Sequence, residues 1–207
     1  TDAVDDLLQS LDLIIAAGAD PASPFNGHVD AEHVAAVGHS AGGPTVVGAA
    51  ADDRVDGYVS LASGSYPDRE MPAKPSLFVA GSTDGVVSAE QITRPAYEAA
   101  PAPSTLWIIQ DAGHNAFDDF CTFGNGTGII GLAEASGLGA FLDGAPQLRT
   151  LGEDGGLPPA VPVETTFPII RHVVTAWVLS LFGSEPATGL GPEVADAYVT
   201  PVVIEQK

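Results

Sequence analysis

Short apolar runs alternate with segments whose apolar positions recur at helical spacing, which predicts buried strands separated by helices. The runs of strand length are residues 33–37, 55–61, 77–81 and 105–110. The segments with helical spacing are residues 1–18, 44–51 and 167–182. Strands that alternate with helices form parallel sheets covered on both faces. We therefore predict an α/β protein, a three-layer α/β/α sandwich around a mostly parallel sheet.

Terminal signals support the first and the last of these helices. Thr1 can cap the first helix, and acidic residues follow it at the positive end of the helix dipole. In the last helix Pro168 is tolerated in the first turn, and Gly183 is a stop signal. We expect this last helix to pack beneath the sheet and to carry no chemistry, with His172 facing solvent.

Residues 38–42 (GHSAG) form a G-x-S-x-G pentapeptide between a predicted strand and a predicted helix. A serine on such a sharp turn takes a strained backbone conformation, and the residues two before and two after it must be small. Gly38 and Gly42 meet that demand. The turn also lifts the hydroxyl above the carboxyl edge of the sheet, so Ser40 is the candidate nucleophile.

Asp84 and His114 each follow a predicted strand, in the chain order Ser, Asp, His. The intervals between the three residues are long enough for one or two β-α-β steps, so all three can meet at one sheet edge. Such a trio supplies a nucleophile, a base and an acid that orients the base. Three further carboxylates remain open as the acid: Asp68, Asp111 and Asp118.

Residues 31–118 resemble α/β-hydrolases of the dienelactone hydrolase, cutinase and polyester hydrolase group. The resemblance rests on the segments 38–43 (GHSAGG), 79–84 (VAGSTD) and 111–114 (DAGH). Dienelactone hydrolases carry cysteine at the nucleophile position, whereas this chain has serine. Esters are therefore the expected substrates, and the resemblance slightly favours a secreted protein.

Carried over residue by residue, the resemblance implies a role for four positions. Ser40 is the nucleophile, His114 the general base and acid, and Asp84 the residue that orients His114. The backbone N–H of Ala41 is one donor to the oxyanion. The second donor of the family comes from a loop ahead of the nucleophile, and no His-Gly-Gly-like loop precedes Ser40. We expect an N-terminal segment or a second chain to supply that donor and earlier strands.

Composition limits the domain count and the classes of partner. At 207 residues with 45% apolar content, the chain can bury one substantial core, so residues 1–207 are read as a single α/β-hydrolase domain, the C-terminal part of the fold. No apolar run reaches the ~18 residues that a membrane span needs. A formal charge of −20 repels nucleic acid, so no nucleic-acid partner is expected.

Neither a metal nor a cofactor is expected. Cys121 is the only cysteine, which excludes an internal disulfide and a thiolate cluster. His28 and His33 flank two acidic residues, but their spacing is not that of an H-E-x-x-H zinc motif.

Residues 117–166 form an insertion between the histidine loop and the last helix, rich in glycine and apolar residues. Long insertions beside a site are often functional. The segment is either a cap that shapes the substrate cleft or a packed excursion that shields the sheet edge. The candidate substrate-binding residues are Phe117 and Phe120 at its start, and His39 beside the nucleophile.

These observations predict a serine hydrolase of carboxylic esters, within the esterase, lipase, cutinase or polyester hydrolase range. A thioesterase or a peptidase remains possible on the same fold. The alternative from another class is a binding protein that retains the hydrolase fold without activity. An intact Ser40, Asp84 and His114 argue against it.

Overall fold

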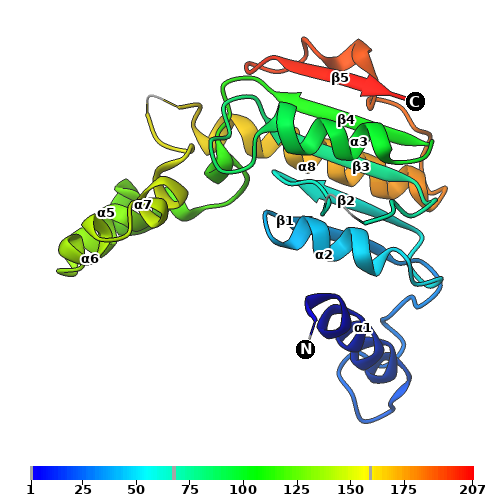
Figure 1. Ribbon diagram of the computed structural model, residues 1–207. Helices are drawn as coiled ribbons and strands as arrows, with labels where there is room; N and C mark the ends of the chain where they lie inside the picture. Colours follow the sequence, from blue (N-terminus) through cyan, green and yellow to red (C-terminus); the bar gives the residue numbers. More distant parts are fainter. Residues whose placement is uncertain (1, 67–68, 159) are drawn as a thin grey trace.

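A mostly parallel five-stranded sheet, in the order β1-β2-β3-β4-β5, forms the centre of the computed structural model (Figure 1). The structure describes residues 2–66, 69–158 and 160–207. The strands are β1 (Ala35–His39), β2 (Gly57–Leu61), β3 (Ser76–Gly81), β4 (Ser104–Ile109) and β5 (Val202–Gln206). The first four are parallel, and each of them matches one of the predicted apolar runs. The predicted fold class is confirmed.

β5 is the one strand that the apolar pattern did not reveal. It pairs antiparallel with β4, and Ile109 lies opposite Val202. Its side chains alternate between the core and solvent, with Val202 and Ile204 buried and Val203 exposed. Its apolar run covers only residues 202–204, which is shorter than the four to eight apolar residues that predict a buried strand.

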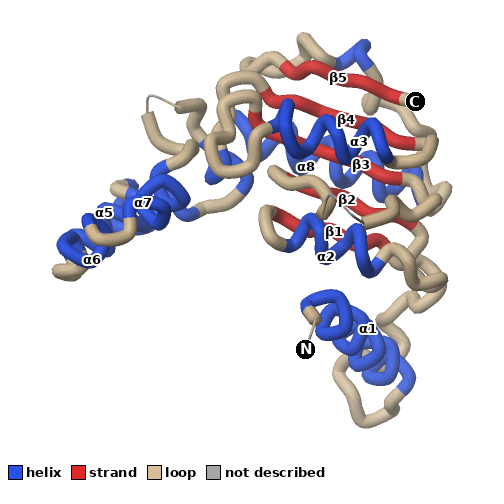
Figure 2. Tube along the Cα trace, in the orientation of Figure 1, coloured by secondary structure: helices blue, strands red, loops and turns tan. Residues whose placement is uncertain are grey.

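Helices cover both faces of the sheet (Figures 1 and 2). The α-helices are α1 (Ala3–Ala19), α2 (Gly42–Ala49), α3 (Arg94–Ala99), α4 (Phe123–Gly126), α5 (Gly128–Ala135), α6 (Gly139–Asp143), α7 (Pro146–Glu153) and α8 (Val163–Leu181). A π-helical turn, η1 (Ala89–Thr93), precedes α3, and the short 3-10 helices are η2 (His114–Phe117), η3 (Phe120–Thr122) and η4 (Pro192–Val194).

Two apolar clusters, one on each face, hold the three layers together. α8 packs against one face, where Val173 and Trp177 meet the buried Trp107 of β4. α2 and α3 cover the other face, where Val47 and Tyr97 pack with Phe78 of β3. The last helix therefore lies beneath the sheet as predicted, and the sandwich fixes the carboxyl ends of β1 to β4 along one edge.

The boundaries of the first and last helices differ from those predicted. Asp2 is the N-cap of α1, where its side chain accepts a hydrogen bond from the Val4 N–H at 3.1 Å; Thr1, the predicted cap, lies outside the described residues. α8 begins at Val163, so Pro168 lies inside the helix rather than in its first turn. The buried Thr166 hydroxyl donates to the Ala116 carbonyl at 2.6 Å, a tertiary contact that extends the helix beyond its local signal.

His172 does not face solvent, which corrects the prediction made from the helical pattern. It is half-buried and hydrogen-bonded to the Tyr198 hydroxyl. Its ring also meets Trp107 edge to face, with 6.3 Å between the ring centroids. The segment that leads to β5 folds back over α8 and covers this position, which no periodicity within α8 could indicate.

α5, α6 and α7 pack against one another outside the sandwich, on the side where β4 ends (Figure 1). We call residues 128–153 the helical lobe. Among the helices that the structure describes, none combines the length and apolar character that a membrane span requires.

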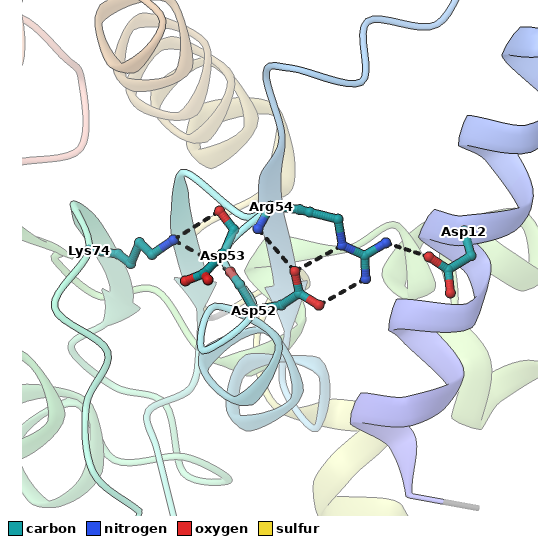
Figure 3. Close-up of polar contacts among 5 residues, drawn as sticks. All are labelled: Asp12, Asp52, Asp53, Arg54 and Lys74. Carbon is teal, nitrogen blue, oxygen red and sulfur yellow. Dashed lines mark hydrogen bonds and ion pairs between the residues drawn. The ribbon is translucent and has the colours of Figure 1, made fainter.

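An ion pair of Arg54 with Asp12 links α1 to the turn that joins α2 to β2, and further polar contacts of Arg54 and Lys74 fix that turn (Figure 3). Arg54 pairs with Asp52 at 2.8 Å and with Asp12 of α1. Lys74 donates to the carbonyl of Val55 at 2.6 Å from the other side. The Arg54 guanidinium lowers the pKa of Asp52 to about 2 from its ordinary value of 3.8. The Arg54–Asp12 pair matters because α1 has no fully buried side chain.

Replacing Arg54 with alanine should lower stability in a pH-dependent way. A carboxyl group whose pKa is lowered by folding stabilises the fold above its unfolded value and loses that contribution as the pH falls. The gap in melting temperature between wild type and R54A should therefore be largest above about pH 5 and close between pH 3.8 and about 2. Thermal unfolding at several pH values measures it.

The control for this prediction is R171A, which removes an equal charge from an exposed arginine on α8 that has no acidic partner among the described residues. A gap between wild type and R54A that did not change with pH would contradict the proposed role of Asp52.

Candidate active site

Ser40 lies on the turn between β1 and α2, with a backbone φ of 53°. Such a left-handed conformation costs of order 1–3 kcal/mol in a residue with a side chain. Hydrogen bonds hold it in place: the Ser40 N–H donates to the Leu61 carbonyl at 3.0 Å, and its own carbonyl accepts from the Gly43 N–H at 2.9 Å. The Ser63 hydroxyl donates to the same Ser40 carbonyl at 2.6 Å. The turn is therefore anchored to the carboxyl end of β2.

The two glycines of the pentapeptide do not serve the turn equally. A Cβ added at Gly38 would lie 2.3 Å from the carbonyl oxygen of Gly42, too close for any side chain. A Cβ added at Gly42 would meet nothing within 4 Å. The expectation that both positions must be small therefore holds for Gly38 and is wrong for Gly42.

His114 lies between Ser40 and Asp84 and is within hydrogen-bond distance of both. Its Nε2 is 2.9 Å from the Ser40 Oγ, and its Nδ1 is 2.9 Å from Asp84 Oδ2. His114 and Asp84 are only 1% and 6% exposed. The other oxygen of Asp84 accepts from the N–H groups of Val86 and Val87 at 2.9 and 2.6 Å. The carboxylate is thus fixed by its own loop and directed at the imidazole.

The other candidate acids lie elsewhere. Asp111 is exposed in a left-handed conformation, and its N–H donates to the Ser82 hydroxyl. Asp118 caps the N–H of Phe120 at 3.0 Å, and burial raises the pKa of its carboxyl. Asp68 falls outside the described residues. Among the candidate acids that the structure describes, Asp84 is the one placed on His114.

The Ala41 N–H lies at the N-cap of α2, directly after Ser40. Backbone N–H groups at a helix N-terminus have no acceptor within the helix, and they favour negative charge. The Ala41 N–H therefore belongs to the positive end of α2, next to Ser40 in the chain.

His39 and Phe117 form one wall beside the nucleophile. The His39 ring stacks on Phe117 with 6.1 Å between centroids and lies 5.0 Å from the His114 ring. Burial, followed by the proximity of His114, lowers the pKa of His39, so its imidazole is neutral near neutral pH. A neutral ring packed between two others serves as a surface rather than as a second base.

Phe120 belongs to an open apolar hollow of about 280 Å³ between η3 and the helical lobe. The side chains around it are almost entirely apolar: Phe120, Ile129, Ile130, Ala133, Leu138, Phe141, Leu142, Leu148 and Leu151. Its α7 wall touches the histidine loop, because the Asn115 side-chain amide donates to the Leu151 carbonyl at 2.7 Å.

His28 and His33, the two histidines that flank acidic residues, lie on the loop between α1 and β1. His33 pairs with Asp30 at 2.7 Å, and both side chains are exposed. In the part of the chain that the structure describes, no three His, Cys, Asp or Glu side chains gather as metal ligands would. Cys121 is a buried free thiol whose pKa is raised by burial.

Asp154 is a polar residue of this region that the sequence did not single out. It lies just past α7 and hydrogen-bonds to the loops that carry Asp84 and His114. The local signal is an acid followed by two glycines at a helix end, which is also typical of an ordinary helix stop. Only the tertiary structure reveals what it contacts.

The sequence model of a family described as PET hydrolase-like matches residues 2–149, more than half of the chain. This match includes the nucleophile turn, Asp84 and His114. The chain belongs to the PET hydrolase-like family. Membership confirms the resemblance to polyester hydrolases of the α/β-hydrolase fold and indicates ester hydrolase activity. No curated protein matches the chain.

Alanine at Gly38 should disrupt the nucleophile turn of this PET hydrolase-like protein, whereas alanine at Gly42 should be tolerated. The G38A variant forces a Cβ into the Gly42 carbonyl, and overpacking of this kind costs about 1–3 kcal/mol. We expect a lower melting temperature and a large loss of Ser40 labelling by a fluorophosphonate.

The G42A variant is the matched control, because the same methyl group enters open space. Equal effects of the two substitutions on stability and labelling would show that the close approach at Gly38 does not shape the turn.

Proposed function

We propose that this protein is a serine hydrolase that cleaves carboxylic esters through an acyl-enzyme intermediate. The observation that carries the proposal is the position of His114, with Ser40 and Asp84 each 2.9 Å from one of its ring nitrogens. Membership of the PET hydrolase-like family supports esters as the substrate class.

In the first step His114 Nε2 takes the proton of Ser40 as the serine oxygen attacks the ester carbonyl. The new C–O bond places negative charge on the carbonyl oxygen, which the Ala41 N–H stabilises. The imidazolium donates its Nδ1–H to Asp84, so the positive charge forms beside a carboxylate that is already in place.

Collapse of this intermediate breaks the bond to the leaving alcohol, and the imidazolium gives its proton to that oxygen. The acyl group is then bound to Ser40. Water attacks the acyl-enzyme as His114 accepts its proton. A second collapse returns the proton to Ser40 and releases the carboxylic acid.

Thioester or peptide cleavage could use the same trio, and the family match is what favours esters over both. A binding protein without activity is less consistent with the geometry. Such a protein has no need to hold a histidine that is 1% exposed between a serine on a strained turn and a buried acid.

We further propose that the substrate lies along His39, Phe117 and the hollow that contains Phe120. The stacked rings reach His114 at one end, and the hollow adjoins the histidine loop through α7. An apolar surface of this kind suits the acyl chain of a fatty ester or a segment of polyester. In this proposal residues 117–166 act as a cap that shapes the cleft within a single domain.

Replacing Ser40 with alanine should abolish hydrolysis of p-nitrophenyl butyrate without unfolding the protein. Loss of a triad member typically lowers kcat by about 10³-fold or more. Wild type should also react covalently with a fluorophosphonate at Ser40, and S40A should not.

The S10A variant serves as the control, because Ser10 is exposed on α1 and its hydroxyl donates to the Asp6 carbonyl of the same helix. Near-normal hydrolysis by folded S40A would reject the nucleophile and with it the proposed mechanism.

Alanine at Phe117 or Phe120 should change the ranking of acetyl, butyryl and octanoyl esters. If the rings bind the acyl chain, kcat/KM for the octanoyl ester should fall most, and Ser40 labelling by a small phosphonate should persist. If the rings only pack against their neighbours, stability should fall and kcat/KM for all three esters should decrease together.

The F25A variant controls for the loss of an aromatic ring, because Phe25 is exposed on the N-terminal loop. An unchanged chain-length ranking in folded F117A and F120A would remove both residues from the substrate site.

A further inference from the structure

Asp154 connects the end of the helical lobe to two loops of the catalytic site. Its Oδ2 accepts a hydrogen bond from the Gly85 N–H at 2.6 Å. Its backbone carbonyl accepts from the Asn115 N–H, also at 2.6 Å. Gly85 directly follows Asp84, and Asn115 directly follows His114. One residue therefore accepts hydrogen bonds from the immediate neighbours of the acid and of the base.

The packing around Asp154 leaves its carboxylate little freedom. A Cβ added at Gly113 would lie 2.4 Å from Asp154 Oδ1, and one added at Gly155 would lie 2.8 Å from the Gly113 Cα. Glycine at both positions lets the segment after α7 approach the histidine loop closely. The contact is thus built into the backbone as well as the side chain.

Asn115 adds a second attachment between α7 and the histidine loop. It is 2% exposed, and its side-chain amide donates to the Leu151 carbonyl at 2.7 Å. The last carbonyls of a helix have no donor within that helix, so partners from elsewhere fix its end. The C-terminus of α7 is therefore fixed to the loop that carries His114.

Among the described residues, the partners of the Asp84 carboxylate are its own loop and His114. Its Oδ1 accepts from the N–H groups of Val86 and Val87, which orients the carboxylate relative to that loop. The Asp154 carboxylate bonds to the same loop from 69 residues further along the chain. Hydrogen bonds to an ionised acceptor are about twice as strong as neutral ones. Catalysis is sensitive to such placement, since a displacement of about 1 Å can cost about 10²-fold in rate.

We propose that Asp154 is a positioning residue for ester hydrolysis, which holds Asp84 and His114 in register through Gly85 and Asn115. The inference rests on the proposed function of Ser40, Asp84 and His114. The family match ends at residue 149, so Asp154 is not among the residues that the match covers. Through Asp154, the end of the helical lobe is hydrogen-bonded to the loops that carry Asp84 and His114.

The test compares D154A and D154N with wild type in the full chain, with p-nitrophenyl butyrate as the substrate. D154A should lower kcat by about 10- to 100-fold and change KM less than about threefold, because the substrate surface is untouched. The acid limb of its kcat/KM profile should move to lower pH, since a less firmly held Asp84 stabilises the imidazolium less.

D154N keeps an oxygen that can accept from the Gly85 N–H, so it should recover most of kcat and the wild-type acid limb. D143A is the matched control, because Asp143 is an acid on the same lobe whose side chain is 77% exposed. It should leave kcat and the pH profile unchanged. Folded D154A with wild-type kcat and an unshifted acid limb would overturn the proposal. So would a D154N variant whose kcat is as low as that of D154A while the acid limbs of both variants stay at the wild-type pH.

If D154A does not fold, D154S takes its place, because serine is suited to a helix end but is too short to reach the Gly85 N–H. Folded D154S with wild-type kcat and acid limb would equally overturn the proposal. Labelling of wild type with a fluorophosphonate separates the proposed function from the positioning role of Asp154. Wild type that neither labels nor hydrolyses ester refutes the proposed function, whereas active wild type with unaffected Asp154 variants refutes only the positioning role.

Discussion

The hydrogen bonds on the two ring nitrogens of His114 are the interaction on which the proposed chemistry depends. With Nδ1 facing Asp84, the histidine directs Nε2 at the Ser40 hydroxyl. The pair is nearly excluded from water, so little solvent competes for either contact. A buried imidazole that becomes charged needs a carboxylate already in place, and the loop N–H groups that hold Asp84 meet that need.

The sheet brings Ser40, Asp84 and His114 together at the ends of its strands. Three parallel strands, β1, β3 and β4, end at one edge of the sheet, and each is followed by one member of the trio. Apolar layers on both faces keep those strand ends in register. The strained backbone of Ser40 persists because bonds from β2 and its following loop secure it.

The helical lobe is attached to the loop that carries His114. It carries an open apolar hollow, and the C-terminal end of its α7 is hydrogen-bonded to the histidine loop through Asn115. The apolar hollow and the histidine loop therefore meet where Leu151, which lines the hollow, accepts the hydrogen bond of Asn115. Asp154 directly follows the lobe and accepts hydrogen bonds from the loops that carry Asp84 and His114, so a substitution there tests whether this contact positions the proposed acid and base.

The sequence by itself determined the parallel strands, the sandwich and the three candidate residues at the strand ends. These follow from local causes: continuous apolar runs are buried, and a serine between a strand and a helix needs glycine at position 38. Only the tertiary structure decided that Asp84 rather than Asp111 or Asp118 meets His114, that α8 begins at Val163, that His172 packs under Tyr198, and that Asp154 contacts Gly85. Each of these depends on residues far apart in the chain, 69 positions in the case of Asp154 and Gly85. Local periodicity and turn chemistry carry no information about such partners, because the packing of whole layers brings them together.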